Sequence, residues 1–434
     1  MDPQTTGNKG NGWALLPFAI FFILYAITFA TTRDLRNMPV SVAFTIATAV
    51  AILSVRRTPF PERLRIFSKG AGNETIMLMV VIFILAGAFS AIAGSMGAVD
   101  ATVNLILYTM PPQAIMAGLF AAACVISMSM GTSSGTVAAL APIAVGISGQ
   151  TDIGPAMILG VVIGGAMFGD NLSFISDTTI VVTKTQGCKM TDKFRVNSMI
   201  VIPMAIIMVM IYIFMGRDIT VTNEVAFDSA DWIKVIPYLV VLITALAGVD
   251  VIIVLLTGII LSSFFGLVSP DFSVWDLTLS AKTGIVSDMG ELIIVTIMAG
   301  GVFEVIKYNK GIDWLIHILT RKISSKRGAE FSIAGLVMFT NFCTANNTIA
   351  CIITGPIAKD ISTRFELDNR KTASLMDTFS CFVQGMIPYG AQLLIAAGIA
   401  NINPVEIVPK LYYPFLTGIA ATIAITLRYP KRYS

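Results

Sequence analysis

Two short polar segments interrupt a sequence that is otherwise apolar enough to lie in a lipid bilayer. The first reads GTSSGT at residues 131–136, and the second reads GDNLSFISDT at residues 169–178. A backbone that leaves the helix inside a bilayer needs partners for its free N–H and C=O groups, so such a break survives only when it packs within protein or lines a cavity. An ionised aspartate at that depth costs about 3 kcal/mol on insertion scales. Asp170 and Asp177 are therefore the first candidates for a functional role.

Both segments carry the residue types that bind a small bare cation. Broken helices hold Na⁺ with backbone carbonyls at half-helix C-termini, and hydroxyl, amide and carboxylate oxygens complete the shell. Burial disfavours the charged form of a carboxylate and a bound cation favours it, so one aspartate can hold either a proton or a metal ion. The candidate ion-binding residues are Asp170, Asp177, Asn171, Ser173, Ser176, Thr178, Thr132, Ser133 and Ser134. Asp170 is the first choice for a carboxylate that holds a metal ion or a proton, and Asp177 is the second.

Two polar segments in the second half of the sequence offer a smaller set of the same residue types. They are TANNT at residues 344–348 and a stretch that runs from Asp377 to a break at residues 384–390. We expect them to form either a second-half ion site or a site for a polar substrate. The candidates are Asn346, Asn347, Thr348, Asp377, Ser380 and Gln384. Asp377 is either a counterpart of Asp170 or a structural carboxylate.

The elements that must position these residues are membrane-spanning helices. The chain has 434 residues, of which 55% are hydrophobic and 13% are charged, and its mean hydropathy is +0.81. Apolar runs of about 20 residues, the length that crosses a ~30 Å hydrocarbon layer, recur throughout. The composition predicts an all-α polytopic membrane protein in contact with the lipid bilayer, with no attached soluble domain. The net charge of +3 is ordinary for such a protein and does not indicate nucleic-acid binding.

The sequence predicts neither a cofactor nor an enzyme. The five cysteines have no ligand-like spacing, and the single histidine, His317, cannot complete a zinc site. Without a histidine-based or metal-based constellation, no catalytic residue is assigned. A channel is disfavoured because the breaks at residues 131–136 and 344–348 predict two opposed re-entrant hairpins, which would close a pore. A small metal cation and a proton are therefore the expected transported or coupling species.

Basic residues assign the loops to the two sides of the membrane. Arg63 and Arg65 place the second loop in the cytoplasm, and Lys189, Lys193 and Arg195 mark the cytoplasmic end of a later crossing. Both termini are then cytoplasmic, and the acidic loop around residues 218–231 is external.

The predicted order of elements repeats upside down in the second half, as in transporters built from inverted repeats. Each repeat has about five transmembrane helices and one re-entrant hairpin, with broken helices near the midplane. The predicted divisions are an N-terminal tail (1–12), repeat 1 (13–216), an external linker (217–231), repeat 2 (232–427) and a cytoplasmic tail (428–434). Repeat 1 contains a hairpin at 114–147 and a broken helix at 155–183, and repeat 2 contains a hairpin at 331–358 and a broken helix at 373–400.

Residue identities between the two halves are few. The shift that pairs Ser134 with Thr348 also pairs Pro142 with Pro356, whereas Asp170 pairs with Asp377 only after a seven-residue adjustment. The prediction of a repeat depends instead on the matching order of breaks and charged loops.

The segments GTSSGT and FGDNLSFISDT, at residues 131–136 and 168–178, resemble the NhaC family of sodium/proton antiporters. Members of that family carry a similar G-T-S-x-G-T tip and a similar G-D-x-x-S-x-x-S-D-T segment. The resemblance implies a bacterial inner-membrane protein with inverted repeats and an elevator-like motion of a transport domain against a scaffold. By position it implies functional roles for Thr132, Ser133, Asp170, Ser173, Ser176 and Asp177.

The leading functional hypothesis is exchange of Na⁺ for H⁺ by alternating access, with the two aspartates of the second polar segment binding the cation or the proton. The alternative is a Na⁺- or H⁺-coupled transporter of a small amino acid or carboxylate. Half-helix N-termini at the hairpin tips suit a carboxylate, and Asn346, Asn347, Gln384 and Tyr389 can bind polar groups of such a solute. The sequence leaves open which substrate is carried and whether the protein is a homodimer.

Overall fold

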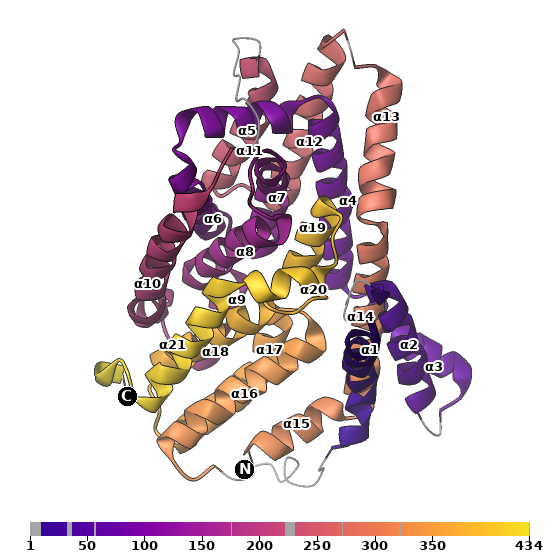
Figure 1. Ribbon diagram of the computed structural model, residues 1–434. Coiled ribbons are helices and arrows are strands. Elements are labelled where there is room, and N and C mark those ends of the chain that lie inside the picture. Colours follow the sequence, from indigo (N-terminus) through magenta and orange to yellow (C-terminus); the bar gives the residue numbers. More distant parts are fainter. Residues whose placement is uncertain are drawn as a thin grey trace.

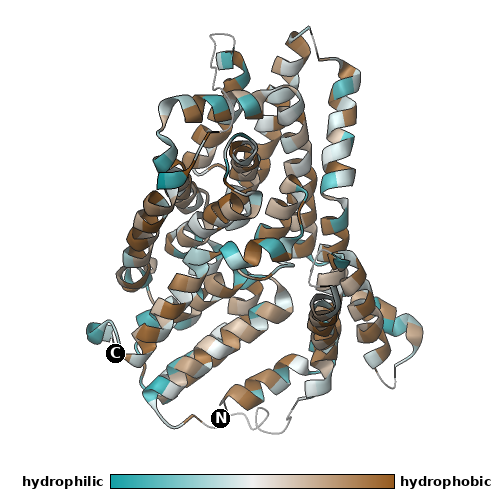
Figure 2. Cartoon of the chain, viewed as in Figure 1, coloured by the Kyte–Doolittle hydropathy of each residue, from teal (hydrophilic) through white to brown (hydrophobic). Residues whose placement is uncertain are grey.

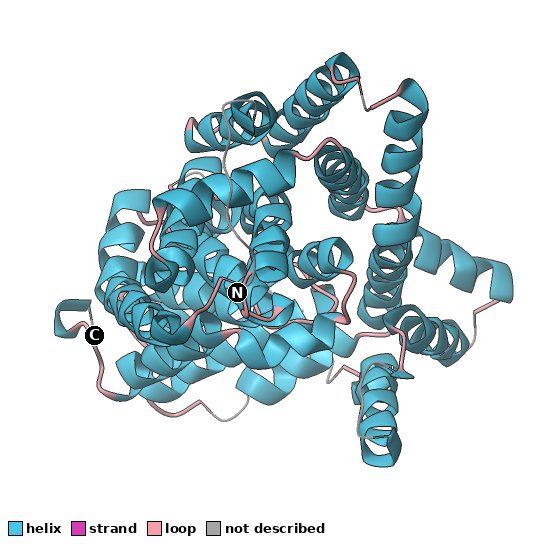
Figure 3. Cartoon of the chain, turned by 45° about the horizontal axis from the view of Figure 1, so that its top comes forward, coloured by secondary structure: helices cyan, strands magenta, loops and turns pink. Residues whose placement is uncertain are grey.

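The regular structure of the protein is helical. The computed structural model describes residues 10–32, 37–55, 58–174, 176–221, 231–270, 272–320 and 323–433. Within these ranges the chain forms helices and no strand, apart from one isolated antiparallel bridge between Thr151 and Val221 (Figure 3). Most of the expected N-terminal tail at 1–12 and most of the expected linker at 217–231 fall outside the described residues.

The first half of the chain contains a helical hairpin and a broken crossing helix between longer apolar helices. Its helices are α1 (Leu16–Thr32), α2 (Val40–Ser54), α3 (Phe60–Ala71), α4 (Glu74–Ser95), α5 (Ala98–Thr109), α6 (Ile115–Met130), α7 (Ser133–Gln150), α8 (Pro155–Leu172), α9 (Asp177–Gln186) and α10 (Met190–Met215). The breaks fall at the predicted polar segments, between α6 and α7 and between α8 and α9.

The second half contains the same order of elements. Its helices are α11 (Asp231–Leu246), α12 (Val251–Val268), α13 (Val274–Lys282), α14 (Gly290–Tyr308), α15 (Gly311–Thr320), α16 (Lys326–Thr344), α17 (Asn347–Arg364), α18 (Asn369–Gln384), α19 (Ala391–Ala400), α20 (Pro404–Ile407) and α21 (Tyr412–Thr426). A π-helical turn at Thr283–Asp288 lies between α13 and α14.

The two halves are related by one constant offset in residue number, the offset that separates Ser133 from Asn347. Both ends of α7 and α17 differ by this repeat offset, as do both ends of α9 and α19 and the starts of α8 and α18. Equivalent elements lie at opposite ends of the molecule: α5 and α13 are in the upper part of Figure 1, and α15 and α3 are in the lower part. The halves are inverted repeats, as predicted, and their register needs no seven-residue adjustment.

Six helical stretches of the described residues are long and apolar enough to cross a membrane: Gly12–Thr32, Glu74–Ser95, Pro112–Met130, Pro155–Gln186, Met190–Asp218 and Val251–Val268. Two bent pairs, Val274–Asp288 with Gly290–Tyr308 and Ala391–Ala400 with Pro404–Lys410, bring the number to eight if each pair is one span. Figure 2 shows hydrophobic residues along most of the helices. The chain is a multi-pass membrane protein.

Each hairpin turns at a residue in the left-handed conformation, which is followed by a helix N-cap. Gly131 has a φ of 69° between α6 and α7, and Ala345 has a φ of 51° between α16 and α17. Thr132 and Asn346 come next, and each side chain accepts a hydrogen bond from the backbone N–H three residues on. A residue with a Cβ is disfavoured in this conformation, so the second tip is more strained than the first. The polar tips are capped starts of helices.

The hairpins pack against the broken helices of the opposite half. Helix α19 packs against α7, and α9 packs against α17. Within each half, α6 and α7 contact α8, and α16 and α17 contact α18. Beside this centre, α14 packs against α2, α3 and α4, which form the right side of Figure 1. The two polar breaks and the two hairpin tips are thereby brought to the middle of the bundle.

Three details differ from the expected elements. Helices α2 and α21 have 15 residues each, which is about 22 Å and shorter than the runs of about 20 residues expected to cross the membrane. The hairpin arms have 16, 18, 19 and 18 residues, and the second hairpin begins at Lys326 instead of residue 331 because charged residues continue the helix before the apolar run. The segment at 274–288 is helical and forms a bent pair with α14.

Candidate functional site

Asp170 lies near the end of α8, where the two hairpin tips and the break before α9 meet. Its side chain is 5% exposed. Ser133 Oγ, at the start of α7, donates to Asp170 Oδ2 at 2.7 Å, and Ser176 Oγ donates to Asp170 Oδ1 at 2.5 Å. Asn347 Nδ2, at the start of α17, donates to Asp170 Oδ2 at 3.4 Å. These four residues, the Asp170 cluster, join both halves of the chain around one carboxylate.

Two glutamine amides extend the Asp170 cluster towards the second break. Gln392 Nε2 donates to Ser133 Oγ at 2.9 Å. Gln384 Nε2 donates to Gln392 Oε1 at 2.9 Å and to the carbonyl of Ala345 at 3.2 Å. Gln384 Oε1 is buried and has no hydrogen-bond partner among the described residues. A buried acceptor of this kind is costly unless it binds a water or a cation. Gln384 Oε1 is therefore an oxygen at the centre that is available to bind one.

A second buried carboxylate, Asp377, lies in the middle of α18 and is ion-paired. Lys193 Nζ, from α10, contacts Asp377 Oδ2, and it also donates to the carbonyl of Asn171 and, at 2.8 Å, to Thr179 Oγ1. Asn197, one turn further along α10, donates to Asn171 Oδ1 at 2.9 Å. Lys193 and Asp377 are 1% and 0% exposed. These five residues, the Asp377 cluster, carry no net charge.

Charge compensation separates Asp170 from the other buried carboxylates. The described part of the chain buries three carboxylates, Asp170, Glu330 and Asp377. Glu330 pairs with buried Lys371 at 2.9 Å, and Asp377 pairs with Lys193. Within the described residues, Asp170 has only hydroxyl and amide partners. A buried charge without an opposite charge is costly, so Asp170 is the position that requires a proton or an external cation.

Four further residues predicted for the ion site lie next to the Asp170 cluster or to the elements that carry it. Thr178 Oγ1 lies 3.0 Å from Ser176 Oγ. Ser173 Oγ donates to the carbonyl of Met128 in α6 at 2.9 Å, which ties the break to the first hairpin. Thr132 caps α7, and Ser134 is half-buried in the first turn of that helix.

The structure places Asp177 and Asn171 away from the carboxylate of Asp170. Asp177 is exposed in the first turn of α9, where an acidic side chain interacts favourably with a helix N-terminus. Because α8 ends at Leu172 and α9 begins only at Asp177, the seven-residue spacing of the two aspartates does not put them on one helix face. Asn171 belongs to the Asp377 cluster instead, and its Nδ2 donates to Asp377 Oδ2 at 3.3 Å.

Several candidates from the second half use their polar groups within the protein. Asn346 caps α17, and Asn347 Oδ1 accepts a hydrogen bond from the backbone N–H of Thr348 at 3.1 Å. Ser380 Oγ donates to the carbonyl of Asp377 in its own helix at 2.9 Å. The hydroxyl of Tyr389 donates to the carbonyl of Phe342 at 2.6 Å. Asn347 is the member of this set that contacts Asp170, and Gln384 is linked to Asp170 through Gln392 and Ser133.

Sequence reasoning missed Lys193, Asn197 and Gln392. The pattern of positive residues assigns Lys193 to a cytoplasmic loop, yet its side chain is buried within α10. Lys193 and Asn197 are four residues apart and therefore lie on one helix face. That spacing at the start of a long apolar helix was the available signal, and the comparable signal for Gln392 is a polar residue inside the apolar run at 391–400.

The repeat offset corrects the pairing between the two halves. Ser133 and Asn347 are counterparts, and both donate to the carboxylate of Asp170. The counterpart of Asp170 is Gln384, because α7 with α17, the starts of α8 with α18, and α9 with α19 all keep the same offset. Asp377 lies two turns before that position, so a shared residue type had suggested the wrong pair.

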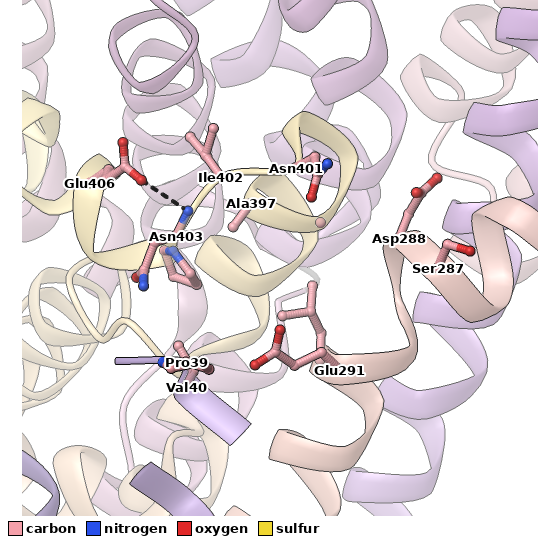
Figure 4. A pocket seen from close by; sticks show the side chains of 13 residues that line it. Pro39, Val40, Ser287, Asp288, Glu291, Ala397, Asn401, Ile402, Asn403 and Glu406 are labelled. Atoms are coloured by element: carbon pink, nitrogen blue, oxygen red, sulfur yellow. Dashed lines mark hydrogen bonds between the residues drawn. The ribbon is translucent and has the colours of Figure 1, made fainter. Parts of the chain in front are cut away.

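A separate cavity of about 390 Å³ opens between α2, the start of α14 and the loop after α19 (Figure 4). It is lined by Asp288, Glu291 and Glu406 among others. Glu406 accepts a hydrogen bond from the backbone N–H of Asn403 at 3.2 Å, and Glu291 accepts one from the hydroxyl of Ser41 at 2.6 Å. These two carboxylates hold local structure at a partly exposed position. The Asp170 cluster is therefore the stronger candidate for an ion site.

A bundle of apolar helices that encloses an uncompensated carboxylate between two hairpin tips defines a multi-pass membrane transporter. A model of the Na⁺/H⁺ antiporter family matches the chain twice, at residues 10–217 and at residues 223–430. The chain therefore belongs to the Na⁺/H⁺ antiporter family. The two matched ranges correspond to the two inverted halves described above.

Similar proteins include antiporters from bacteria. The chain is 25% identical over 325 residues to the Na⁺/H⁺ antiporter NhaC of Alkalihalophilus pseudofirmus, covering 68% of this chain and 70% of that protein. It is 23% identical over 396 residues to the NhaC of Bacillus subtilis, covering 83% and 85%. It is 20% identical over 449 aligned positions to the malate-2H⁺/Na⁺-lactate antiporter of Bacillus subtilis, covering 95% and 93%. These relatives agree with the NhaC-family resemblance of the two polar segments.

Among solved structures, the YdaH transporter of Alcanivorax borkumensis aligns with a TM-score of 0.43 and 13% identity. The alignment covers 97% of this chain and 99% of that one.

Proposed function

We propose that the chain exchanges Na⁺ for H⁺ through one site, at which Asp170 binds the two ions in turn. The observation that carries the proposal is that Asp170 is buried without a basic partner among the described residues, whereas Glu330 and Asp377 each have one. The hydroxyl oxygens of Ser133 and Ser176 add to an oxygen shell of the kind that Na⁺ prefers. When Na⁺ leaves, a proton on Asp170 removes the charge that burial disfavours. Competition for one carboxylate then couples the two ions.

The unpaired Oε1 of Gln384 gives further support for a cation at the centre. This oxygen is buried, and the amide of the same residue is linked through Gln392 to Ser133. A hydrated Na⁺ can satisfy such an acceptor, which a hydrocarbon environment cannot. The glutamine pair thus extends the oxygen-rich region from the carboxylate into the second half.

Alternating access by an elevator-like motion is the proposed way in which this site reaches both sides of the membrane. The Asp170 cluster is built from both hairpins and from α8 and its break, and the hairpins pack against α9 and α19 of the opposite halves. We propose that these elements move as one body against α1–α4 and α11–α14. In this proposal the protein lies in a bacterial inner membrane with both termini in the cytoplasm. Each of the two hairpins enters the membrane and leaves it on the same side.

Dye-loaded proteoliposomes test the exchange directly. Addition of Na⁺ should change the internal pH with wild-type protein, and the Na⁺ concentration for half-maximal exchange should rise as the pH falls, because protons compete for Asp170. Asp170→Asn should abolish the exchange. Asp177→Asn is the matched control, since it makes the same chemical change at an exposed carboxylate seven residues away, and it should exchange like the wild type. Normal exchange by Asp170→Asn, or its loss in a folded Asp177→Asn, would reject the assignment.

A coupled transporter of a small carboxylate is the second candidate, because the malate-2H⁺/Na⁺-lactate antiporter aligns over 95% of this chain. Against it, Asn346 and Tyr389, two groups suited to such a solute, already bind backbone groups of the protein. Uptake of labelled lactate and malate into the same proteoliposomes separates the candidates. Accumulation of either acid that is lost in Asp170→Asn would favour the carboxylate transporter.

A further inference from the structure

We propose that Lys193 is a built-in cation that fills a second Na⁺ site at Asp377, so that the protein carries one exchangeable cation where its oxygen ligands would otherwise hold two. The inference rests on the proposed function of Asp170 as a Na⁺ site. It assigns to Lys193 a role in setting how many cations the chain binds.

The surroundings of Lys193 Nζ have the composition of a cation site. Its ammonium contacts the carboxylate of Asp377, the carbonyl of Asn171 and the hydroxyl of Thr179. Broken transporter helices bind Na⁺ with these same three types of oxygen. Asn171 is in the last turn of α8, so its carbonyl lies at the negative end of that helix. Three oxygens meet the three N–H bonds that an ammonium can donate.

The fold does not require this polar cluster, because the other half packs the equivalent helices with apolar residues. Helix α10 packs on α18, and its counterpart in the second half, α20 with α21, packs on α8. At the repeat offset, Asp377, Lys193, Asn197 and Thr179 correspond to Ile163, Ile407, Leu411 and Leu393, all fully buried. Apolar residues often replace a buried ion pair with no loss of stability. A reason other than packing therefore accounts for the charges at Lys193 and Asp377.

The Asp377 cluster adjoins the Asp170 cluster through consecutive residues of α8. Asn171 follows Asp170 directly, and its backbone and side chain bind Lys193, Asn197 and Asp377. Without the ammonium, Asp377 would be a second buried carboxylate with neutral partners beside the first. Such a carboxylate would bind Na⁺ for the same electrostatic reason as Asp170.

Equilibrium binding of ²²Na⁺ to the purified full-length chain tests the inference. The wild type should bind one Na⁺ per chain, and Lys193→Ala, which removes the ammonium and leaves room, should bind two. Lys193→Ala/Asp377→Asn has the same space where the Lys193 side chain was but lacks the carboxylate, so it should again bind one Na⁺ per chain. Lys193→Ala/Asp170→Asn should also bind one, and this ion should be lost when Asp377→Asn is added. Na⁺ should raise the unfolding temperature of Lys193→Ala more than that of the wild type.

The outcomes separate this inference from the proposed function. If wild-type binding does not depend on Asp170, the proposed function fails. If it does depend on Asp170 and a folded Lys193→Ala still binds one Na⁺, the second site does not exist. If Lys193→Ala fails to fold even in Na⁺ while Lys193→Ala/Asp377→Asn folds, the oxygens around Asp377 do not accept Na⁺ and the inference is equally overturned.

Discussion

Asp170 and Asp377 are both buried aspartates on crossing helices, and they differ in the charge of what faces them. Asp377 contacts the ammonium of Lys193, whereas Asp170 accepts hydrogen bonds from Ser133, Ser176 and Asn347. Burial is nearly the same at the two positions. The difference teaches that a positive charge supplied by the chain, more than burial or the number of hydrogen bonds, distinguishes a compensated carboxylate from an uncompensated one, which is the property on which the proposed ion exchange at Asp170 depends.

The largest expected effect follows from removing one aspartate at a time. Asp377→Asn leaves the ammonium of Lys193 buried without an opposite charge, which should lower the free energy of unfolding by about 3 to 5 kcal/mol. Asp170→Asn removes an uncompensated charge and should leave that free energy unchanged or higher. Denaturant unfolding of the detergent-solubilised protein in Na⁺-free buffer compares the two variants.

An apolar double variant completes this first test. Asp377→Leu/Lys193→Met imitates the isoleucines at the equivalent positions and should recover most of the stability lost in Asp377→Asn. If Asp377→Asn proves no more destabilising than Asp170→Asn, the contrast between the two aspartates is not one of charge compensation.

An intermediate effect on exchange is expected at the two hairpin tips. Each tip contributes one residue at the equivalent position, and the two residues lie at different distances from the carboxylate of Asp170. Ser133 Oγ lies 2.7 Å from Asp170 Oδ2, and Asn347 Nδ2 lies 3.4 Å from it. Ser133→Ala should raise the Na⁺ concentration for half-maximal exchange about fivefold, because one net hydrogen bond is worth about 1 kcal/mol. Asn347→Ala should raise it less, at the same amount of folded protein. A larger effect from Asn347→Ala would mean that the second hairpin dominates the site.

The smallest effect concerns how the two crossing helices begin. Asp368 caps α18 and binds Arg370 at 2.9 Å, whereas Gly154 at the start of α8 has no side chain to do so. Partial burial raises the pKa of Asp368, but the hydrogen bonds and charge of Arg370 outweigh this and hold the pKa below its usual value. Asp368→Ala should cost about 1 kcal/mol of unfolding free energy at neutral pH.

The pH dependence of that cost has a definite sign. Because the folded-state pKa of Asp368 is the lower one, its contribution is complete above the unfolded-state pKa and is lost as the pH falls through the folded-state value. The gap in stability between the wild type and Asp368→Ala should therefore narrow in acid. A gap that widens in acid would exclude the ionised carboxylate as the cause.

The sequence predicted the breaks well because their residue types are distinctive within apolar surroundings. Glycine, serine, threonine and asparagine at 131–136 and 344–348 cannot be explained as lipid-facing residues, and both segments are hairpin tips in the structure. The identity of Asp170 as a buried polar centre followed from the same argument. Its contact with Ser133 could be anticipated only as a meeting of two breaks, since no local pattern joins positions so far apart in the sequence.

Other parts of the site depend on packing that a linear pattern does not contain. Lys193 lies between Lys189 and Arg195, which have the same charge, and its direction into the bundle is set by the face of α10 that meets α18. Asp177 is seven residues after Asp170, a spacing that would place both on one face of a continuous helix. The helix is not continuous, because α8 ends at Leu172 and Asp177 begins α9. Gln384 could be recognised as the counterpart of Asp170 only by comparing where the helices of the two halves begin and end, because the two residues are of different types.

The shell of Asp170 draws on both halves of the chain: Ser133 and Ser176 come from the first, and Asn347 comes from the second. A polypeptide of half this length could enclose such an aspartate only by pairing with another copy that entered the membrane the other way up. Joining the two copies in one gene fixes their ratio and relative direction. It also allows each copy to mutate separately, so one can retain an aspartate where the other has a glutamine.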